Sequence, residues 1–390
     1  MPSKWPRVEN PVPGREAFSR TDPAAVLSQA AVLLSLGAQS RGDEETFAAR
    51  ARAAGLAENV EFWPAEDSAL FGRPRLTAPA GRLDIQRVQQ GLAGRYGEWV
   101  LPRLPKSQAD VTKGVAKALP ELGPLAYDQA TADAGAELME VCLNHSEQLL
   151  RVASAASYFE MSTESERLIG ILAEGCGSDD ELVRELAATA LWHVSPEHVV
   201  LNSLKARGGR AAASASGNTT LLVHGTWAAS SSWWQPHGDF HDYILNNVRS
   251  DLYSQSDYFG WSGDYSDSAR AQAAVQLANW VSAHNDAGLD LITHSHGGNV
   301  AMLGTHSGLQ IGELILLSCP VHFPKYLPDF SQIRKAVSIR VHLDLVILAD
   351  RGGQKFKLSQ IQENVLPVWF DHQATHDPAT WDKYNVKSRL

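Results

Sequence analysis

A serine set between two histidines is the part of this sequence with the clearest chemical potential. Ser295 follows the apolar segment 289–293, stands between His294 and His296, and is followed by two glycines. The abrupt change from apolar to small and polar residues predicts a strand that passes directly into a helix, with Ser295 on the turn between them. Such a turn exposes the serine hydroxyl beside backbone N–H groups at the positive end of the helix. The pattern therefore favours nucleophilic attack on an acyl carbonyl.

The residues around Ser295 support this turn. Gly297 and Gly298 leave room for the close packing that a strand-to-helix turn requires. We expect one of the flanking histidines, His294 and His296, to pack under the loop and the other to line the cleft, without a catalytic role for either.

A second apolar segment upstream also ends in residues of interest. Segment 219–223 predicts a strand and is followed by His224-Gly225-Thr226-Trp227. Between it and Ser295 the sequence predicts a helix near 240–248, a short strand over 258–261 and an amphipathic helix over 266–284, whose apolar residues recur at spacings of three and four.

Together, the His-Gly segment and the serine turn resemble the α/β-hydrolase superfamily, and the resemblance covers essentially all of residues 211–390. It implies an α/β fold, with a mostly parallel sheet and helices on both faces. It also implies that the backbone N–H groups of Thr226 and His296 form an oxyanion hole. Thr293 departs from the family pattern, which has Gly or Ala at that position, and its branched side chain has to be accommodated beside the turn.

The family pattern also requires an acid after the serine. Segments 312–318 and 338–343 predict two further strands, and the second is followed by Asp344-Leu345-Val346. This arrangement resembles the acid loop of the family, so Asp344 is the first choice for the acid and Asp350 is the alternative.

A histidine should follow the acid, and two residues compete for this position. A last predicted strand, 365–370, leads into His372 and then His376. His372 lies directly at the strand end, where the general base of the family usually sits, whereas His376 precedes an Asp-Pro pair that predicts a helix start. His372 is the first choice and His376 the alternative.

These residues predict a serine hydrolase that cleaves carboxylic esters without a cofactor. His372 would take the proton of Ser295 during attack and return it to the leaving alcohol, while Asp344 would orient the imidazole. Water would then resolve the acyl enzyme. An acyltransferase or thioesterase would use the same residues, and a degenerate hydrolase scaffold that serves as an interaction protein is the alternative from another class.

Four tryptophans come from loops expected near the cleft: Trp227, Trp233, Trp234 and Trp261. They are candidates for an apolar or aromatic substrate pocket, and the alternative is that they bury the loops that carry them. Only about twenty residues separate the strands at 312–318 and 338–343, which leaves no room there for a helical lid. The sequence therefore predicts an open cleft unless the amino-terminal region covers it.

The histidines beside Ser295 also raise the alternative of a metal site. Residues 293–296, Thr-His-Ser-His, resemble the opening of the metallo-β-lactamase motif, which continues with Asp and His. Gly298 and Asn299 occupy those two positions here. Too few ligands remain for a two-metal centre, and no other His, Cys or Asp cluster has metal-ligand spacing. We therefore expect no metal.

The amino-terminal region, residues 1–210, carries no catalytic pattern and is helical in character. Segment 147–155 aligns with segment 180–188 at a period of 33 residues. The repeat, within about 135–194, resembles HEAT-like helical hairpins. The alternative is an ordinary helical bundle in which the two segments are similar by chance. A small, Gly-rich stretch at about 207–218 predicts a linker between the two domains, 1–210 and 211–390.

The net charge, apolar content and cysteine number of the chain indicate its expected partners and location. The formal net charge of −10 argues against a nucleic-acid surface, and no run of eighteen apolar residues predicts a transmembrane segment. Three cysteines are too few, and odd in number, for a disulfide framework, so a reducing cytoplasm is the expected location. The expected partners are a small-molecule or lipid ester as substrate and a possible protein partner at the helical region.

Overall fold

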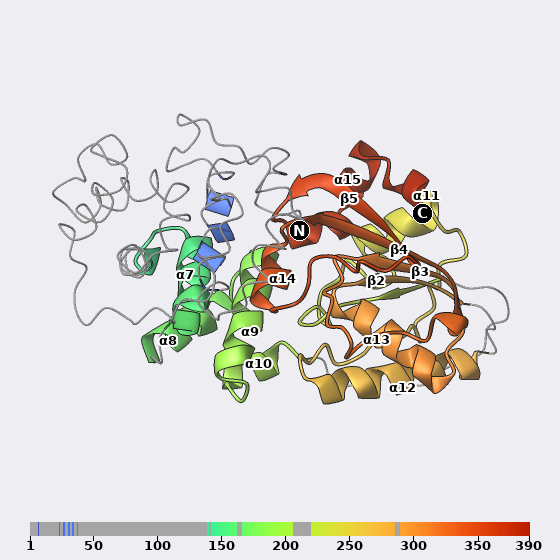
Figure 1. Ribbon diagram of the computed structural model, residues 1–390, viewed down its shortest axis with the longest axis horizontal. Coiled ribbons are helices and arrows are strands. Elements are labelled where there is room, and N and C mark those ends of the chain that lie inside the picture. The colour runs from blue at the N-terminus through green and yellow to red at the C-terminus, as the bar shows by residue number, and fades with distance from the viewer. Residues whose placement is uncertain are drawn as a thin grey trace.

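The computed structural model of the chain is shown in Figure 1. It describes residues 142–161, 166–205, 220–284 and 289–390 as continuous stretches, and the isolated residues 7, 23, 26, 27, 30, 31, 33, 34, 37 and 139 before them. The predicted linker and most of the first 141 residues lie outside the described residues. Both aligned segments of the repeat lie within them, as do the predicted strands except for residue 219.

A five-stranded parallel sheet forms the centre of the carboxyl-terminal part. The strands follow one another across the sheet in chain order: β1 (Thr220–Val223), β2 (Leu289–His294), β3 (Ile311–Leu317), β4 (Ile333–His342) and β5 (Ile361–Trp369). Every neighbouring pair is parallel. All five carboxyl ends therefore meet at one edge, which confirms an α/β fold for this part of the chain.

Helices cover both faces of the sheet (Figure 1). Alternate strand residues point to opposite faces of the sheet, so each strand contributes residues to two apolar clusters, one on each face. Leu291 of β2 belongs to the cluster of the face covered by α12 (Asp267–Ala283) and α13 (His296–Gly304). Ile292, the next residue, belongs to the cluster of the other face, under α11 (Asp239–Asn247) and α15 (Pro378–Lys383).

The short strand predicted over 258–261 is wrong. That segment has no strand pairing, and the isolated parallel bridge beside β1 joins Thr220 to Leu252 instead. The segment is held by its side chains, because the Trp261 indole donates a hydrogen bond of 2.8 Å to the His224 carbonyl. An aromatic run anchored in this way resembles a strand in sequence although it joins no ladder.

The predicted repeat corresponds to two helices of a compact helical layer. Its first copy lies on α7 (Gln148–Met161) and its second on α9 (Glu181–Val194), with α8 (Glu166–Gly175) between them and α10 (Val199–Ser203) after them. A Cβ on Gly175 would lie 2.7 Å from side-chain carbons of both Val152 and Ala187, so glycine allows α8 to approach α7 and α9 closely. HEAT-like stacking remains a prediction.

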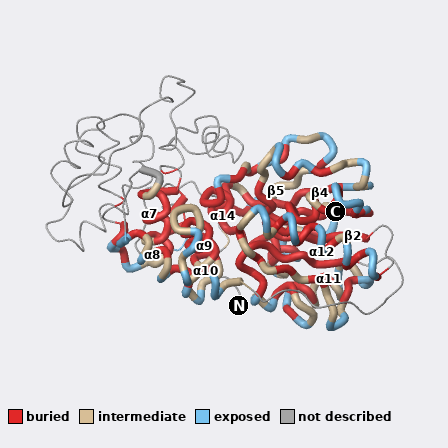
Figure 2. The backbone as a smooth tube through the Cα atoms, turned by 90° about the horizontal axis from the view of Figure 1, so that it is seen from below, coloured by how far each residue is buried: buried red, intermediate tan, exposed pale blue. Residues whose placement is uncertain are grey.

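The helical layer packs on the carboxyl edge of the sheet. Its apolar residues form one buried cluster with Leu343, with residues of α14 (Leu345–Ala349), and with Trp369 and Phe370 at the end of β5. Figure 2 shows α9 beside α14, both largely buried. No helix among the described residues is long and apolar enough to cross a membrane. The helical region thus covers the edge at which the predicted site residues meet.

Candidate active site

Ser295 lies on a strained turn between β2 and α13. Its backbone angles, φ 51° and ψ −133°, are unusual for a residue with a side chain, and they cost on the order of 1–3 kcal/mol. The Ser295 N–H donates a hydrogen bond of 2.8 Å to the Leu317 carbonyl at the end of β3, which fixes the turn against the sheet. Strain of this kind persists only where the surrounding structure holds it, and it is typical of functional sites.

The glycine after His224 makes room for this serine. A Cβ on Gly225 would lie 2.6 Å from the Ser295 Cβ, closer than carbon atoms of this kind approach each other. Gly297, in the first turn of α13, lies equally close to the end of β1, because a Cβ there would be 2.5 Å from the Val223 carbonyl oxygen. The His-Gly segment and the serine turn are therefore packed directly against each other.

Relieving the strain at Ser295 is expected to stabilise the fold. Ser295→Gly should raise the free energy of unfolding by about 1 kcal/mol relative to Ser295→Ala, because both lack the hydroxyl but only glycine adopts positive φ without strain. Urea denaturation of the two variants measures the difference. Equal stabilities would show that the turn stores no strain.

Thr293 does not disturb the turn. It is an ordinary member of β2, paired with Val223 on one side and Leu316 on the other. Its hydroxyl donates a hydrogen bond of 2.9 Å to the Ile315 carbonyl of β3, so the polar atom is satisfied although the residue is buried. The departure from the family pattern is accommodated by a side-chain bond within the sheet.

The two predicted oxyanion donors flank the serine. His296 is the first residue of α13, so its N–H has no partner within the helix. The N–H of Thr226, in the turn after β1, donates to no backbone carbonyl of the described residues. Both donors are therefore available, one on each side of the point where β1 and β2 end.

The predicted acid and the first-choice base are hydrogen-bonded to each other. Nδ1 of His372 lies 2.7 Å from Oδ2 of Asp344. Asp344 is the N-cap of α14, and its other oxygen accepts hydrogen bonds from the N–H groups of Val346 and Ile347 at 3.0 and 3.1 Å. The carboxylate is therefore locked in place, and it holds the imidazole with Nδ1 protonated and Nε2 available as a base.

The environment of His372 sets its basicity. Burial alone would lower the pKa of His372, but the Asp344 carboxylate, together with Glu185 and Asp350, outweighs burial and raises it above its ordinary value. Nε2 of His372 makes no hydrogen bond with any described residue, and so none with the Ser295 hydroxyl. Contacts of this kind are often long in a free enzyme and tighten when substrate binds.

The alternative acid and base lie in other surroundings. His376 stacks on Trp233 with ring centroids 4.0 Å apart, and its Nε2 is hydrogen-bonded to the Gln373 amide. Burial and the nearby His372 hold the pKa of His376 well below its usual range. Asp350 faces His296 and His322 rather than either candidate base. Among the four, only Asp344 and His372 form a carboxylate–imidazole pair.

All four tryptophans proposed to bind substrate lie in the interior, and three of them are held by hydrogen bonds of their indole N–H groups. Trp227 donates its indole N–H to Thr189 of α9 at 3.3 Å. Trp234 and Trp261 each donate theirs at 2.8 Å to a backbone carbonyl near the end of β1. All three are buried. These contacts match the alternative in which the rings bury their own loops, and substrate binding by them remains a prediction.

Trp233 lines a cavity between the helical region and the sheet. The cavity has a volume of about 570 Å³, and Gln373, His376 and the first turn of α9 also line it. The Trp233 indole N–H has no hydrogen-bond partner among the described residues. Of the four tryptophans, Trp233 is therefore the one whose surroundings leave a polar atom for a ligand.

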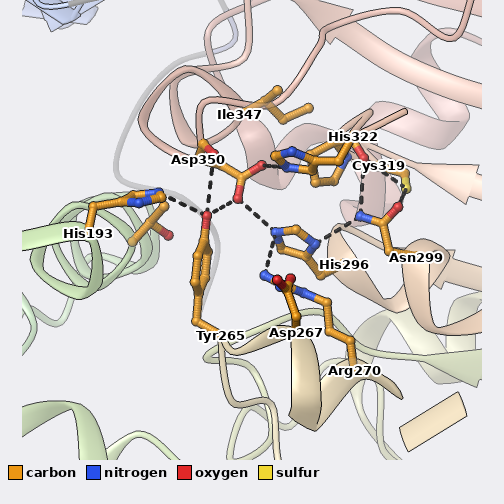
Figure 3. Close-up of polar contacts among 12 residues, drawn as sticks. His193, Tyr265, Asp267, Arg270, His296, Asn299, Cys319, His322, Ile347 and Asp350 are labelled. Atoms are coloured by element: carbon orange, nitrogen blue, oxygen red, sulfur yellow. Dashed lines mark hydrogen bonds and ion pairs between the residues drawn. The ribbon is translucent and has the colours of Figure 1, made fainter. Parts of the chain in front are cut away.

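A second polar cluster lies beside the serine turn, around Asp350 (Figure 3). One Asp350 oxygen lies 2.8 Å from Nε2 of His296 and the other 2.6 Å from Nε2 of His322, and Tyr265 also donates to this carboxylate. Asn299 donates to Nδ1 of His296, so the proton of this imidazole is on Nε2. Burial alone would raise the pKa of Asp350, but the two histidines outweigh it and hold the pKa well below its usual range.

The same cluster is a candidate metal-binding group. Among the described residues, His296, His322 and Asp350 are one set whose ligand atoms all lie within 4.8 Å of one another. The guanidinium of Arg270 lies 3.1 Å from Nε2 of His296, so a cation bound there would face an existing positive charge. We interpret the cluster as a hydrogen-bonded network that supports the start of α13. Sequence spacing missed it because its members come from three separate segments.

The buried histidines predict how stability depends on pH. Burial lowers the pKa of His224 to about 4 and of His296 to about 3, and it lowers the pKa of His294 and His376 well below the usual range. Unfolding releases neutral histidines that take up protons below about pH 6.5. Stability should fall as pH decreases from 6.5 towards 4, by up to about 1.4 kcal/mol per pH unit for each histidine.

His372 has the opposite sign. Because its pKa is raised, its contribution to the free energy of unfolding is complete below about pH 6.5 and is lost as pH rises through the raised pKa. His372 therefore does not offset the loss of stability expected between pH 6.5 and 4. Urea denaturation at pH 7, 6 and 5 measures the effect, and equal unfolding free energies at all three values would contradict the neutral state of these histidines.

Sequence reasoning missed a carboxylate that faces His372. Glu185 of α9 places Oε2 3.9 Å from Nε2 of His372, although the two residues lie in different predicted domains. The available signal was its position, because Glu185 falls on the apolar face of α9 with Leu182 and Leu186 and is buried like them. A charged residue on a buried helix face is unusual unless it is paired.

Comparisons of the chain with protein-family models, with curated proteins and with solved structures returned no match. The α/β architecture hosts many unrelated activities, so the fold alone does not select one. The function has to be argued from the residues that meet at the carboxyl edge of the sheet.

Proposed function

We propose that this chain is a serine hydrolase that cleaves carboxylic esters through an acyl-enzyme intermediate, on an α/β-hydrolase fold. The observation that carries the proposal is the arrangement of three residues at one sheet edge. Ser295 lies on a strained strand-to-helix turn after β2, and the hydrogen-bonded pair Asp344 and His372 follows β4 and β5. The order serine, acid, histidine along the chain is that of the resemblance described above.

Each residue has a chemical role in this proposal. His372 takes the proton of the Ser295 hydroxyl through Nε2 while the oxygen attacks the ester carbonyl, and it then returns the proton to the leaving alcohol. Asp344 keeps Nδ1 protonated and stabilises the imidazolium that forms. The N–H groups of Thr226 and His296 stabilise the oxyanion, and one such donor contributes on the order of 3 kcal/mol to lowering the barrier.

A fluorophosphonate probe tests the nucleophile directly. The wild-type chain is expected to become labelled at Ser295, because the activated hydroxyl displaces fluoride from phosphorus. Ser295→Ala should abolish the label, whereas Ser331→Ala, which changes a surface serine of an unrelated turn, should leave it intact. An unlabelled wild type would contradict the enzyme and favour an interaction protein on a hydrolase scaffold.

A further inference from the structure

Glu185 is a buried carboxylate that the proposed mechanism does not yet use. It belongs to α9 of the helical region, and only 4% of its surface is exposed. Oε2 of Glu185 accepts a hydrogen bond of 2.7 Å from the Gln373 side chain, which fixes its position. Gln373 directly follows His372 in the chain, so the base and the carboxylate are held by neighbouring residues.

The gap between this carboxylate and the base has a definite size. Nε2 of His372 and Oε2 of Glu185 are 3.9 Å apart, which is too long for a hydrogen bond. One oxygen atom placed about 2 Å to the side of the line between them would lie about 2.8 Å from both, an ideal hydrogen-bond length. The buried Nε2 has no hydrogen-bond partner among the described residues, so it lacks the group that such an oxygen would supply.

The surroundings favour a neutral oxygen that donates in both directions. In the neutral base, Nε2 is an acceptor because Nδ1 carries the proton towards Asp344. Burial raises the pKa of Glu185 to about 7, so above that pH its side chain is a carboxylate and an acceptor as well. A water molecule has the two O–H donors that this pair of acceptors requires, whereas an ester carbonyl has none.

We propose that Glu185 is a positioning residue for the water that hydrolyses the acyl enzyme. This inference rests on the proposed ester hydrolase and concerns only its second half-reaction. The water donates one hydrogen to Nε2 of His372 and the other to Glu185, which together aim its oxygen at the acyl carbon on Ser295.

The step balances without any further reactant. The water oxygen bonds to the acyl carbon as one proton passes to Nε2 of His372, and the second proton stays on that oxygen, hydrogen-bonded to Glu185. The tetrahedral intermediate then breaks its bond to the Ser295 oxygen, which takes the proton from His372. The products are the free serine and a carboxylic acid, and Glu185, which is ionised above its raised pKa of about 7, exchanges no proton in the step.

This role also gives the helical region a function in catalysis. α9 supplies Glu185 to a site whose other residues come from the sheet, and Trp227 and Tyr265 tie α9 to the same edge through Thr189 and His193. Removing the region would leave the base facing unordered solvent. A site that requires a residue from both regions explains why they share one apolar cluster.

The test separates acylation from deacylation with p-nitrophenyl acetate. Rapid mixing records a burst of nitrophenolate, which reports acylation of Ser295, followed by a steady state that reports deacylation. Glu185→Ala should leave the burst rate within about twofold and slow the steady state by about 10- to 100-fold, since a misplaced reactant costs about this much. Mass spectrometry of acid-quenched samples should find the acyl enzyme accumulated in this variant.

Two further variants control the measurement. Glu174→Ala removes the same side chain from α8, where the exposed carboxylate pairs with Arg151 at 2.9 Å and does not face the base. It should leave both phases unchanged. Glu185→Gln keeps an oxygen acceptor and should recover most of the deacylation rate that Glu185→Ala loses.

The possible outcomes separate the two proposals. A wild type that neither hydrolyses the ester nor reacts with the fluorophosphonate would overturn the hydrolase and this role with it. Ester hydrolysis with equal deacylation rates in wild type and Glu185→Ala would overturn the role of Glu185 alone. A slower burst in Glu185→Ala, with unchanged deacylation of the acyl enzyme, would also overturn it, because the residue would then serve only to shape the site.

Discussion

His372→Ala is expected to lower kcat/KM for hydrolysis of p-nitrophenyl acetate by about 10⁴-fold or more, as removal of a general base does in serine hydrolases. His376→Ala should keep activity within about tenfold. The two histidines differ in their partners, because His372 contacts the Asp344 carboxylate at 2.7 Å whereas His376 contacts the Gln373 amide and the Trp233 ring.

Steady-state kinetics on both variants decides between the histidines. Thermal unfolding must accompany the kinetics, since His376→Ala removes a buried ring from a stack and should destabilise the fold more than it affects chemistry. Loss of activity confined to His376→Ala, with His372→Ala fully active, would contradict the assignment of the base.

Asp344→Asn is expected to lower kcat by about 10⁴-fold while the protein stays folded. An asparagine oxygen can still accept from the N–H groups of Val346 and Ile347, so the cap of α14 is retained. Its NH₂ group would then face Nδ1 of His372 and donate to it. The imidazole would carry its proton on Nε2, which is the wrong tautomer for a base.

The pH profile of the same variant gives a second readout. For the wild type, kcat/KM should rise with pH to a midpoint above 6.5, because the pKa of His372 is raised. The residual activity of Asp344→Asn should titrate at lower pH, since burial then acts without the opposing carboxylate. Asp329→Asn, the same change at a half-buried capping aspartate in another part of the fold, is the control. Unchanged kcat and midpoint in Asp344→Asn would exclude Asp344 as the partner of the base.

The buried position of the site affects how substrate reaches it. Ser295 is 6% exposed, and Asp344 and His372 are fully buried under the helical layer. The sequence predicted an open cleft unless the amino-terminal region covered it. The helical region shares an apolar cluster with this edge of the sheet, which matches a covered site. Under the proposed function, a substrate therefore has to reach a serine that the helical layer covers.

Much of the sheet was predictable from the sequence because parallel strands are buried on both faces. Such strands contain short, continuous apolar runs, and all five strands overlap a predicted segment, although β4 and β5 begin five and four residues before theirs. The same criterion failed at 258–261, where an aromatic run is buried by side-chain bonds to His224 and not by strand pairing. Burial produces an apolar sequence pattern both in the strands and in segment 258–261, and only the strands pair with a neighbour in the sheet.

The sequence by itself determined the local chemistry of the serine turn. Its residues predict that β2 ends immediately before Ser295, that a helix begins immediately after it, and that glycines allow the close approach of β1. These features depend on neighbours in the chain, so their residue types are sufficient to predict them.

Only the tertiary structure decided which side chains meet. Two aspartates and two histidines at the ends of β4 and β5 were equivalent in order, and the direction of each side chain pairs Asp344 with His372 while it turns Asp350 towards His296 and His322. The distant Glu185 enters for the same reason. Side-chain pairing is set by the packing of elements that are remote in sequence. A hydrogen bond requires two atoms to lie about 3 Å apart, and spacing along the chain does not determine such distances.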